Sequence, residues 1–396
     1  MGWQAEGSMS AIIPREFQRK SYEFVLPEEL IAQYPSKVRG QDRLLVLDRM
    51  HTLQPQISTF EQLLNFLPEK SLLVLNNSKV LPARLVGKRE TGGRFEFLLL
   101  TPLPLLLKKA HPLGDGRFEV QAEGLLHMGA KVKVGMQLRF GPTLLAEVLE
   151  LGTYGKHLFL LTYSGDLEAL FQNQGTIPLP PYIRRKAEQS DTERYQTVYA
   201  DEHKIGSVAA PTAGLHFTKN LQNTLLLAGI EFCSVTLYVG YGTFSPVREE
   251  DIRNHKMHQE FIEVPEQTAK AIKQAKAEGR NIIAVGTTSL RCLEGMYAAQ
   301  KKVTTYTGWT DIFLYPGKTF SVVDGLLTNF HLPGSSLIML VAAFLGLDYT
   351  MAAYKLAIEH RFQFFSFGDA MLIVPTKKRE DTCASSLHGS QKTLIT

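Results

Sequence analysis

The feature that most constrains the fold is a change of hydrophobic period in the middle of the chain. Four segments within residues 85–163 alternate apolar and polar side chains, and glycine-containing turns such as Gly92-Gly93 separate most of them. Period-two alternation is typical of half-buried strands, and short strands with no helical pattern between them indicate a small sandwich or barrel. We predict an inserted all-β domain, a small barrel, over residues 85–169.

The regions on either side have a different pattern. The runs at 71–80 and 281–286 are almost continuously apolar, as in strands of a sheet that is covered on both faces. Helices are expected from Lys219 to Gly229 and over 267–279, each ending at a glycine. Alternating strands and helices indicate parallel pairing. The pattern predicts an α/β main domain with a mixed, largely parallel sheet, which the β-barrel interrupts.

This main domain is expected to be discontinuous, formed by residues 21–84 and 170–375. A further helix is expected over 58–67, with Ser58 as its cap. Residues 1–20 are expected to be a disordered extension, with the native start at Met1 or Met9, and residues 376–396 a disordered tail.

Composition limits the class of protein. The chain has 396 residues, enough for two or three domains, and its net charge of +4 permits a nucleic-acid partner without requiring one. Its three scattered cysteines form no disulfide framework or zinc pattern, so a cytoplasmic location is expected. The longest apolar run, 337–347, is shorter than the roughly 20 residues of a membrane span and predicts a buried helix. No coiled-coil heptad is visible, so a monomer is expected.

A run of small residues, "GSVAAPTAGLHFT" at 206–218, ends near His216. Small side chains add little packing and cost conformational entropy, so such a run indicates that something approaches the backbone closely. That neighbour is either another part of this chain or a ligand, and the residues alone leave both open.

The segment "VGTTSLRCLE" (285–294) predicts a buried strand, a turn and a helix. In an open α/β sheet, ligands lie at the carboxyl ends of strands, and a helix N-terminus suits an anion. Thr287, Thr288 and Ser289 therefore either hold a carboxylate or phosphate or merely cap the helix.

An aromatic cluster precedes a glycine and an aspartate in "FFSFGD" (364–369). Phe365 and Phe367 are either core residues or a face for a cation or a stacked base. Asp369, beside Gly368, is expected to be exposed.

Three other histidines are candidates for proton transfer. His255 and His258 lie in "NHKMHQE", where Glu260 follows, and His331 precedes a proline at a helix entry. Spacing i, i+3 without a further ligand at a standard position disfavours zinc, so we expect no metal. Acid–base residues and ordinary surface histidines both remain open for the first pair.

Two basic segments could contact phosphates. One holds Arg184, Arg185 and Lys186, with Tyr182 just before them; the other holds Arg84 and Lys88, followed by Arg89. A solvated run of charge is the commoner explanation of such segments.

The order of motifs is more specific than any one of them. The succession is "LVLNNSKVLPARL", "PPYIRR", "GSVAAPTAGLHFT", "VTLYVGYGTFSPV", "NHKMHQEF", "VGTTSLRCLE", "TDIFLYPG", "VDGLLTNFHLP" and "FFSFGDAML". From about Tyr22 to Val374 it closely resembles the S-adenosylmethionine:tRNA ribosyltransferase-isomerases of queuosine biosynthesis. The resemblance implies an α/β domain interrupted by a β-barrel.

The resemblance also implies a reaction. The ribosyl part of S-adenosylmethionine would move to 7-aminomethyl-7-deazaguanine at the tRNA wobble position and rearrange to epoxyqueuosine, with release of adenine and methionine. S-adenosylmethionine would be a co-substrate, and no metal is implied.

Placed on this reaction, the candidate residues take hypothetical roles. Ala213 and Gly214 would admit adenosine, Thr287, Thr288 and Ser289 would take the methionine carboxylate, and Phe365, Phe367 and Asp369 would face the sulfonium or ammonium. The catalytic candidates are His216, His255, His258 and His331. The tRNA-binding candidates are Arg84, Lys88, Tyr182, Arg184 and Arg185.

The chain departs from the family pattern at Asn77, Lys79, Tyr238, Tyr241, Phe362 and Gln363. These departures leave two alternatives open. One is a catalytically inactive tRNA-binding protein of the same fold, and the other is a metal-dependent hydrolase built on His255, His258 and Glu260.

Overall fold

The computed structural model describes residues 13–88, 93–240 and 246–375. The predictions for residues 1–12, Arg89, Tyr241 and the tail 376–396 lie outside the described residues. Residues 13–20 do not form a disordered extension, because they contain the 3-10 helix η1 (Arg15–Phe17) and the start of η2 (Arg19–Tyr22), whose Tyr22 is fully buried.

The main domain is built on a sheet of nine strands in the described part of the chain. In spatial order these are β16 (Tyr306–Thr310), β14 (Glu260–Val264), β13 (Glu231–Leu237), β3 (Leu72–Asn76), β15 (Ile282–Val285), β17 (Gly325–Asn329), β18 (Ala370–Val374), β1 (Arg43–Asp48) and β2 (Gln56–Thr59). Parallel pairing joins β13 to β3, β3 to β15, β15 to β17 and β18 to β1. The other four neighbouring pairs are antiparallel. The sheet is mixed as predicted, but parallel pairing is half of it rather than most of it.

The continuous apolar strands are explained by two cores, one on each face of the sheet. Leu72 and Val74 of β3 pack in the same core as α5 (Glu266–Ala277) and α6 (Thr287–Gln300). Leu73 and Leu75 point the other way, into a core that includes α4 (Lys219–Leu227). Successive strand residues therefore serve opposite faces, and both must be apolar.

The apolar run near residue 340 forms α7 (Ser336–Leu345), followed after Gly346 by α8 (Leu347–Glu359). Gly346 has φ +87°, a left-handed conformation that ends the first helix. In the part of the chain that the structure describes, no single helix is long and apolar enough to cross a membrane. The two helices meet that condition only together, with a bend of 115° between them.

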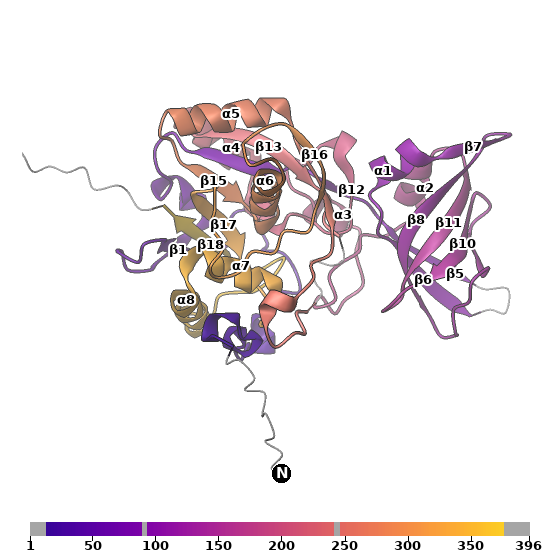
Figure 1. Cartoon of the computed structure of the whole chain (residues 1–396), viewed down its shortest axis with the longest axis horizontal. Helices are drawn as coiled ribbons and strands as arrows, with labels where there is room; N and C mark the ends of the chain where they lie inside the picture. The colour runs from indigo at the N-terminus through magenta and orange to yellow at the C-terminus, as the bar shows by residue number, and fades with distance from the viewer. Residues whose placement is uncertain (1–12, 89–92, 241–245, 376–396) are drawn as a thin grey trace, which may run out of the picture.

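A second, antiparallel sheet forms a nearly closed barrel to the right of the main domain in Figure 1. Its strands are β5 (Arg84–Lys88), β6 (Arg94–Leu99), β7 (His111–Gly114), β8 (Arg117–Met128), β9 (Gln137–Phe140), β10 (Leu144–Leu151) and β11 (Lys156–Ser164). The end strands β5 and β9 approach each other. Burial alternates residue by residue along β11, and Phe95, Phe97, Phe140 and Phe159 fill a separate core. Two helices accompany the barrel, α1 (Leu103–Lys109) and α2 (Leu167–Gln174).

The chain enters and leaves the barrel at one place. Arg84 and Thr176 form an isolated antiparallel bridge, in which the Thr176 N–H donates to the Arg84 carbonyl at 2.9 Å. Close by, β4 (Lys79–Val80) pairs in parallel with β12 (Ile205–Ser207). A short helix, α3 (Asp191–Arg194), lies on the returning segment.

The helix expected over 58–67 is shorter and of another type. It is the 3-10 helix η4 (Phe60–Asn65), whose N-cap is Thr59 and makes no side-chain capping bond. Ser58 lies in β2 and donates through Oγ to Gln62 Oε1 at 2.7 Å, so its prediction as a cap is wrong. Pairing with β1 extends the chain through Thr59 and delays the helix.

Candidate active site

A pocket opens where β15 and β17 end. Ala213, Gly286, Thr287 and Asn329 are part of its wall, and Tyr182 and Phe365 come from segments far away in sequence. It is a partly open hollow of about 820 Å³, a figure that includes space open to solvent. The carboxyl edge of parallel strands is where open α/β sheets bind ligands.

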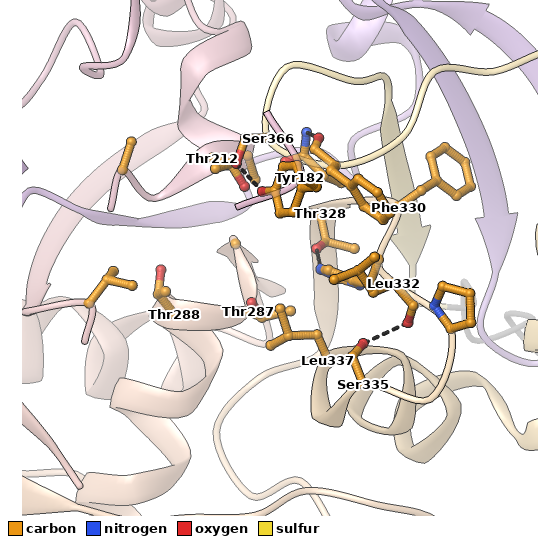
Figure 2. Close-up of a pocket in the computed structure, with 18 of the residues that line it drawn as sticks. Tyr182, Thr212, Thr287, Thr288, Thr328, Phe330, Leu332, Ser335, Leu337 and Ser366 are labelled. Atoms are coloured by element: carbon orange, nitrogen blue, oxygen red, sulfur yellow. Dashed lines mark hydrogen bonds between the residues drawn. The ribbon is translucent and has the colours of Figure 1, made fainter. Parts of the chain in front are cut away.

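The structure brings six of the sequence-predicted site residues to this pocket. They are Tyr182, Ala213, Thr287, Thr288, His331 and Phe365. Figure 2 shows Tyr182, Thr212 and Ser366 on one side of the hollow and Thr287 and Thr288 well away from them on another. The pocket therefore has an aromatic end and a threonine end.

The threonine end is the N-terminus of α6. Gly286 precedes the helix with φ +91°, and the first N–H groups of the helix have no partner within it. Thr288 is 7% exposed and its Oγ1 has no hydrogen-bond partner. Ser289 is turned away, since its Oγ donates to the Val285 carbonyl at 2.7 Å. The partial positive charge of the helix end and the free Thr288 hydroxyl suit an anion.

The aromatic end is formed by Tyr182 and Phe365, whose ring centroids are 4.6 Å apart. The Tyr182 hydroxyl and Ser366 Oγ share a hydrogen bond of 2.5 Å, and burial raises the pKa of the phenol above its ordinary value. Phe365 has φ +73°, a conformation that costs a non-glycine residue roughly 1–3 kcal/mol. Its N–H donates to the Phe330 carbonyl at 3.1 Å, and its carbonyl accepts from Gly368 N at 2.9 Å. This strained backbone holds the ring at the pocket wall.

His331 lies in the pocket wall and is buried. Its Nε2 is 3.3 Å from Thr328 Oγ1 and its Nδ1 is 3.3 Å from the Tyr354 hydroxyl. Burial lowers its pKa to about 3, so the imidazole is neutral at physiological pH. It is positioned to contact a ligand as a neutral donor or acceptor.

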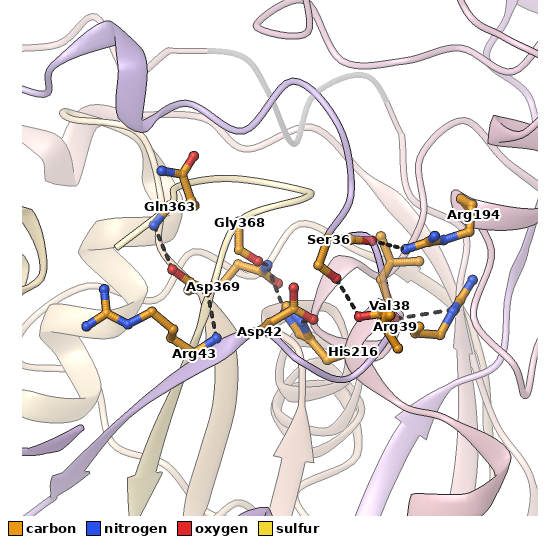
Figure 3. Close-up of polar contacts among 12 residues, drawn as sticks. Ser36, Val38, Arg39, Asp42, Arg43, Arg194, His216, Gln363, Gly368 and Asp369 are labelled. Atoms are coloured by element: carbon orange, nitrogen blue, oxygen red, sulfur yellow. Dashed lines mark hydrogen bonds and ion pairs between the residues drawn. The ribbon is translucent and has the colours of Figure 1, made fainter. Parts of the chain in front are cut away.

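His216 does not line the pocket. It contacts Asn329 through one ring nitrogen and Asp42, labelled beside it in Figure 3, through the other. Its Nδ1 is 2.7 Å from Asp42 Oδ2, its Nε2 is 3.2 Å from Asn329 Nδ2, and its ring lies 4.9 Å from that of Phe60. Burial is the largest influence on the Asp42 carboxyl and raises its pKa, but the charge and hydrogen bond of His216, with a hydrogen bond from Ser36, outweigh it and leave the pKa lowered.

The structure explains one glycine of the small-residue run by packing. A Cβ on Gly214 would lie 1.9 Å from the Tyr199 hydroxyl and 2.7 Å from a carbon of Thr197. Gly214 therefore makes room for this chain's own side chains, whereas Ala213 beside it faces the pocket. The run of small residues therefore gives space both to this chain's own side chains, at Gly214, and to the pocket, at Ala213.

Asn329 is the residue that sequence reasoning missed. It is 1% exposed and ends β17, and it lines the pocket. The usable signal was the polar ending of an otherwise mostly apolar strand, "GLLTN", two residues before His331.

Three further predicted site residues, His255, His258 and Phe367, lie away from the pocket wall. His255 pairs with Glu249 at 2.8 Å and borders a different hollow, and burial lowers the pKa of His258. Phe367 packs edge-on against Tyr195. Among the described residues no group of three His, Cys, Asp or Glu side chains could hold a metal.

Asp369 is not exposed, contrary to expectation. It is 6% exposed, and its carboxylate accepts hydrogen bonds of 2.7 Å from the backbone N–H groups of Arg43 and Gln363 (Figure 3). Burial raises its pKa. It fixes the loop that carries the aromatic end of the pocket.

The two basic segments meet in a second hollow between the barrel and the 176–187 segment. Arg84, Arg184 and Arg185 line it, together with Arg94 and Lys186. The first three already hold carboxylates, namely Glu96, Glu28 and Asp191 respectively. Lys88 is exposed on β5 but is not part of this lining, and Tyr182 belongs to the other pocket.

Most departures from the family pattern are accommodated structurally. The Tyr238 hydroxyl donates to Glu263 Oε1 at 3.2 Å, Asn77 Oδ1 accepts from Thr236 Oγ1 at 2.7 Å, and Lys79 pairs with Glu202. Phe362 is buried beneath the Arg43 guanidinium, 3.9 Å from its ring centre. Gln363 contributes its backbone N–H to Asp369.

Comparison with known proteins gives a consistent result. The family model described as "Queuosine biosynthesis protein" matches residues 19–373. An S-adenosylmethionine:tRNA ribosyltransferase-isomerase of Nitratidesulfovibrio vulgaris is 53% identical over 90% of this chain and 98% of its own length. One from Caldanaerobacter subterraneus is 46% identical over 90% of this chain and all of its own length. The crystal structure of an S-adenosylmethionine tRNA ribosyltransferase from Thermotoga maritima has a TM-score of 0.50 and 35% identity, and covers 89% of this chain and all of that one. The chain belongs to the queuosine biosynthesis protein family.

Proposed function

We propose that this protein transfers and isomerises the ribosyl part of S-adenosylmethionine onto 7-aminomethyl-7-deazaguanine at the tRNA wobble position. The products are epoxyqueuosine in tRNA, adenine and methionine. Family membership supports the proposal, as does one feature of the pocket: an aromatic pair and a helix N-terminus face the same hollow from different sides. S-adenosylmethionine carries a flat base at one end and a carboxylate at the other.

The chemistry follows from the sulfonium. A positively charged sulfur acidifies the adjacent ribose 5′ carbon, so a base can remove a proton there. The resulting ylide opens the ring and expels adenine, the tRNA amine attacks, an epoxide closes and methionine departs. A site for this sequence needs water exclusion and acid–base groups near the ribose.

In this proposal Thr287 and Thr288 hold the methionine carboxylate, and the Tyr182–Phe365 pair stacks on adenine. Of the four candidate histidines, His331 lines the pocket and faces the ribose, while His216 acts through Asn329. The protein acts as a cytoplasmic monomer without a metal.

The tRNA is proposed to enter along the hollow between the barrel, residues 85–169, and the main domain. Arg84, Arg94, Arg184, Arg185 and Lys186 line it, and phosphates are the expected partners of such a surface. Lys88 extends this basic surface along β5.

Adenine release tests the proposal. Purified protein is mixed with S-adenosylmethionine and tRNA that carries the aminomethyl-deazaguanine base, with unmodified tRNA as the control. Adenine that appears only with the modified tRNA is the expected result. Bound tRNA without adenine would favour the inactive binding protein, and metal-dependent hydrolysis of the RNA would favour the hydrolase.

A further inference from the structure

The pocket wall contains a buried oxygen with no partner. Asn329 is 1% exposed, and its Oδ1 accepts no hydrogen bond. Buried amide oxygens are nearly always hydrogen-bonded, and an unsatisfied one costs roughly 1–3 kcal/mol. Because Asn329 lines the pocket, a ligand there can supply the missing donor.

The other side of the same amide is fully engaged. Asn329 Nδ2 donates to the Phe365 carbonyl at 3.0 Å, lies 3.4 Å from the Gly368 carbonyl, and is 3.2 Å from His216 Nε2. Asp42 holds the opposite nitrogen of that imidazole at 2.7 Å. Turning the amide over would set its oxygen against two carbonyls. The surroundings therefore fix the orientation of the amide: Nδ2 is hydrogen-bonded within the protein, and Oδ1 is left as a free acceptor.

The position of Asn329 Oδ1 in the pocket indicates which part of the ligand donates to it. Its amide is bonded to the backbone of Phe365, which with Tyr182 forms the aromatic end of the pocket. Thr287 and Thr288, where an anion fits, lie away from that end in Figure 2. In an amino acid the ammonium is bound to the same carbon as the carboxylate, so the ammonium of the methionine tail belongs near the threonines. A donor at the aromatic end belongs to the stacked base.

We propose that Asn329 is a specificity-determining residue, whose Oδ1 accepts a hydrogen bond from the exocyclic 6-amino group of adenine. This inference rests on the proposed use of S-adenosylmethionine and adds which group selects its base. The site would then prefer a 6-aminopurine to purines that lack the amine or carry a carbonyl there.

The test compares two ligands on two proteins. The ligands are S-adenosylmethionine and its analogue with hydrogen in place of the 6-amino group. Their dissociation constants are measured by calorimetry on the wild type and Asn329→Ala, alone and with unmodified tRNA. The wild type is expected to prefer the amine about 10- to 100-fold, and the variant no more than about three-fold.

A matched variant separates specificity from packing. Asn76 is another buried asparagine at the end of a strand, but its Oδ1 already accepts from the N–H groups of Ser78 and Leu237, both at 3.1 Å. Asn76→Ala is expected to lower stability while keeping the wild-type ligand preference. Thermal unfolding establishes that each variant is folded.

The outcomes separate this inference from the proposed function. Equal affinity of the wild type for the two ligands overturns the adenine contact, whether or not Asn329→Ala folds. A preference that survives in Asn329→Ala overturns it as well. A wild type that binds S-adenosylmethionine with the expected preference but releases no adenine from it would refute the proposed function and keep the inference. Absence of binding would refute both.

Discussion

The barrel and the pocket edge of the main sheet follow different rules of packing. Within residues 85–88 and 93–169, every buried side-chain polar atom has a hydrogen-bond partner, and the one exception in the described barrel strands is Arg84 Nε at the start of β5. Interior positions alternate regularly with exposed ones. At the pocket edge, Thr288 Oγ1 and Asn329 Oδ1 are buried without partners, and Phe365 has a left-handed backbone. The residues of the barrel are explained by folding alone. Those of the pocket leave two polar atoms for which a ligand could supply partners.

Filling the pocket is expected to have the largest effect, and it tests whether the pocket edge differs from the barrel because it binds a ligand. Ala213→Leu adds three carbons at the wall, so we expect the dissociation constant of S-adenosylmethionine to rise at least about 100-fold, at a stability cost of about 1–3 kcal/mol. Calorimetry and thermal unfolding measure the two effects.

The matched control is Ala146→Leu in the barrel, where the alanine is fully buried in β10. It is expected to cost similar stability and leave the dissociation constant within two-fold. If both variants weakened binding equally, the difference between the two regions would not be one of function.

Gly214→Ala tests whether that glycine serves packing or the ligand. Because the new methyl would collide with the Tyr199 hydroxyl, the free energy of unfolding is expected to fall by about 1–3 kcal/mol. In a Tyr199→Phe background, which lacks that hydroxyl, the loss should be smaller. Urea unfolding of the four proteins measures the coupling. Weaker S-adenosylmethionine binding without loss of stability would contradict the packing explanation.

His331→Gln tests how the stability of the pocket wall depends on pH. The ordinary pKa of histidine is 6.5 and that of His331 is about 3, so between these values the unfolded chain binds the extra proton. The free energy of unfolding therefore falls as the pH falls. Between pH 7 and 5 the wild type should lose about 2 kcal/mol more than His331→Gln. Urea midpoints at several pH values give both curves, and parallel curves would show that the imidazole is not held neutral.

The smallest effect is expected on the basic surface. Lys186→Ala removes one charge from the hollow beside the barrel, so binding of the modified tRNA should weaken a few-fold at moderate salt. The slope of log affinity against log salt should fall by about 1. Lys273→Ala, exposed on α5, is the control and should keep the wild-type slope. Equal slopes for all three proteins would place the RNA elsewhere.

Much of the architecture could be predicted from local pattern. Alternating apolar and polar residues predicted the strands of the barrel, and continuous apolar runs predicted β3 and β15. Both predictions were possible because the burial of a strand determines which of its positions are apolar. The antiparallel pairs of the main sheet could not be predicted in this way, because a buried strand has the same apolar pattern whether its neighbour is parallel or antiparallel.

Pocket-lining residues were easiest to predict where their position depends on chain neighbours. Thr287 and Thr288 follow a strand and open a helix, which the sequence displays. Gly214 depends on Tyr199, and Asn329 on the Phe365 carbonyl, contacts made across the fold. Asp369 was expected at the surface because a glycine precedes it. It is buried, and its carboxylate accepts hydrogen bonds from two backbone N–H groups.

The bridge between Arg84 and Thr176 has a consequence for how such a protein can be assembled. The chain leaves and re-enters the main domain at residues that share a hydrogen bond. The two ends of the barrel segment therefore lie side by side, and Ile205 and Val208 of the main domain complete the barrel core. A tight turn of a few residues could close that gap without displacing β3, β15 or β17, and closing a short loop costs little entropy. An insertion between two such neighbouring residues leaves the path of the main-domain chain almost unchanged.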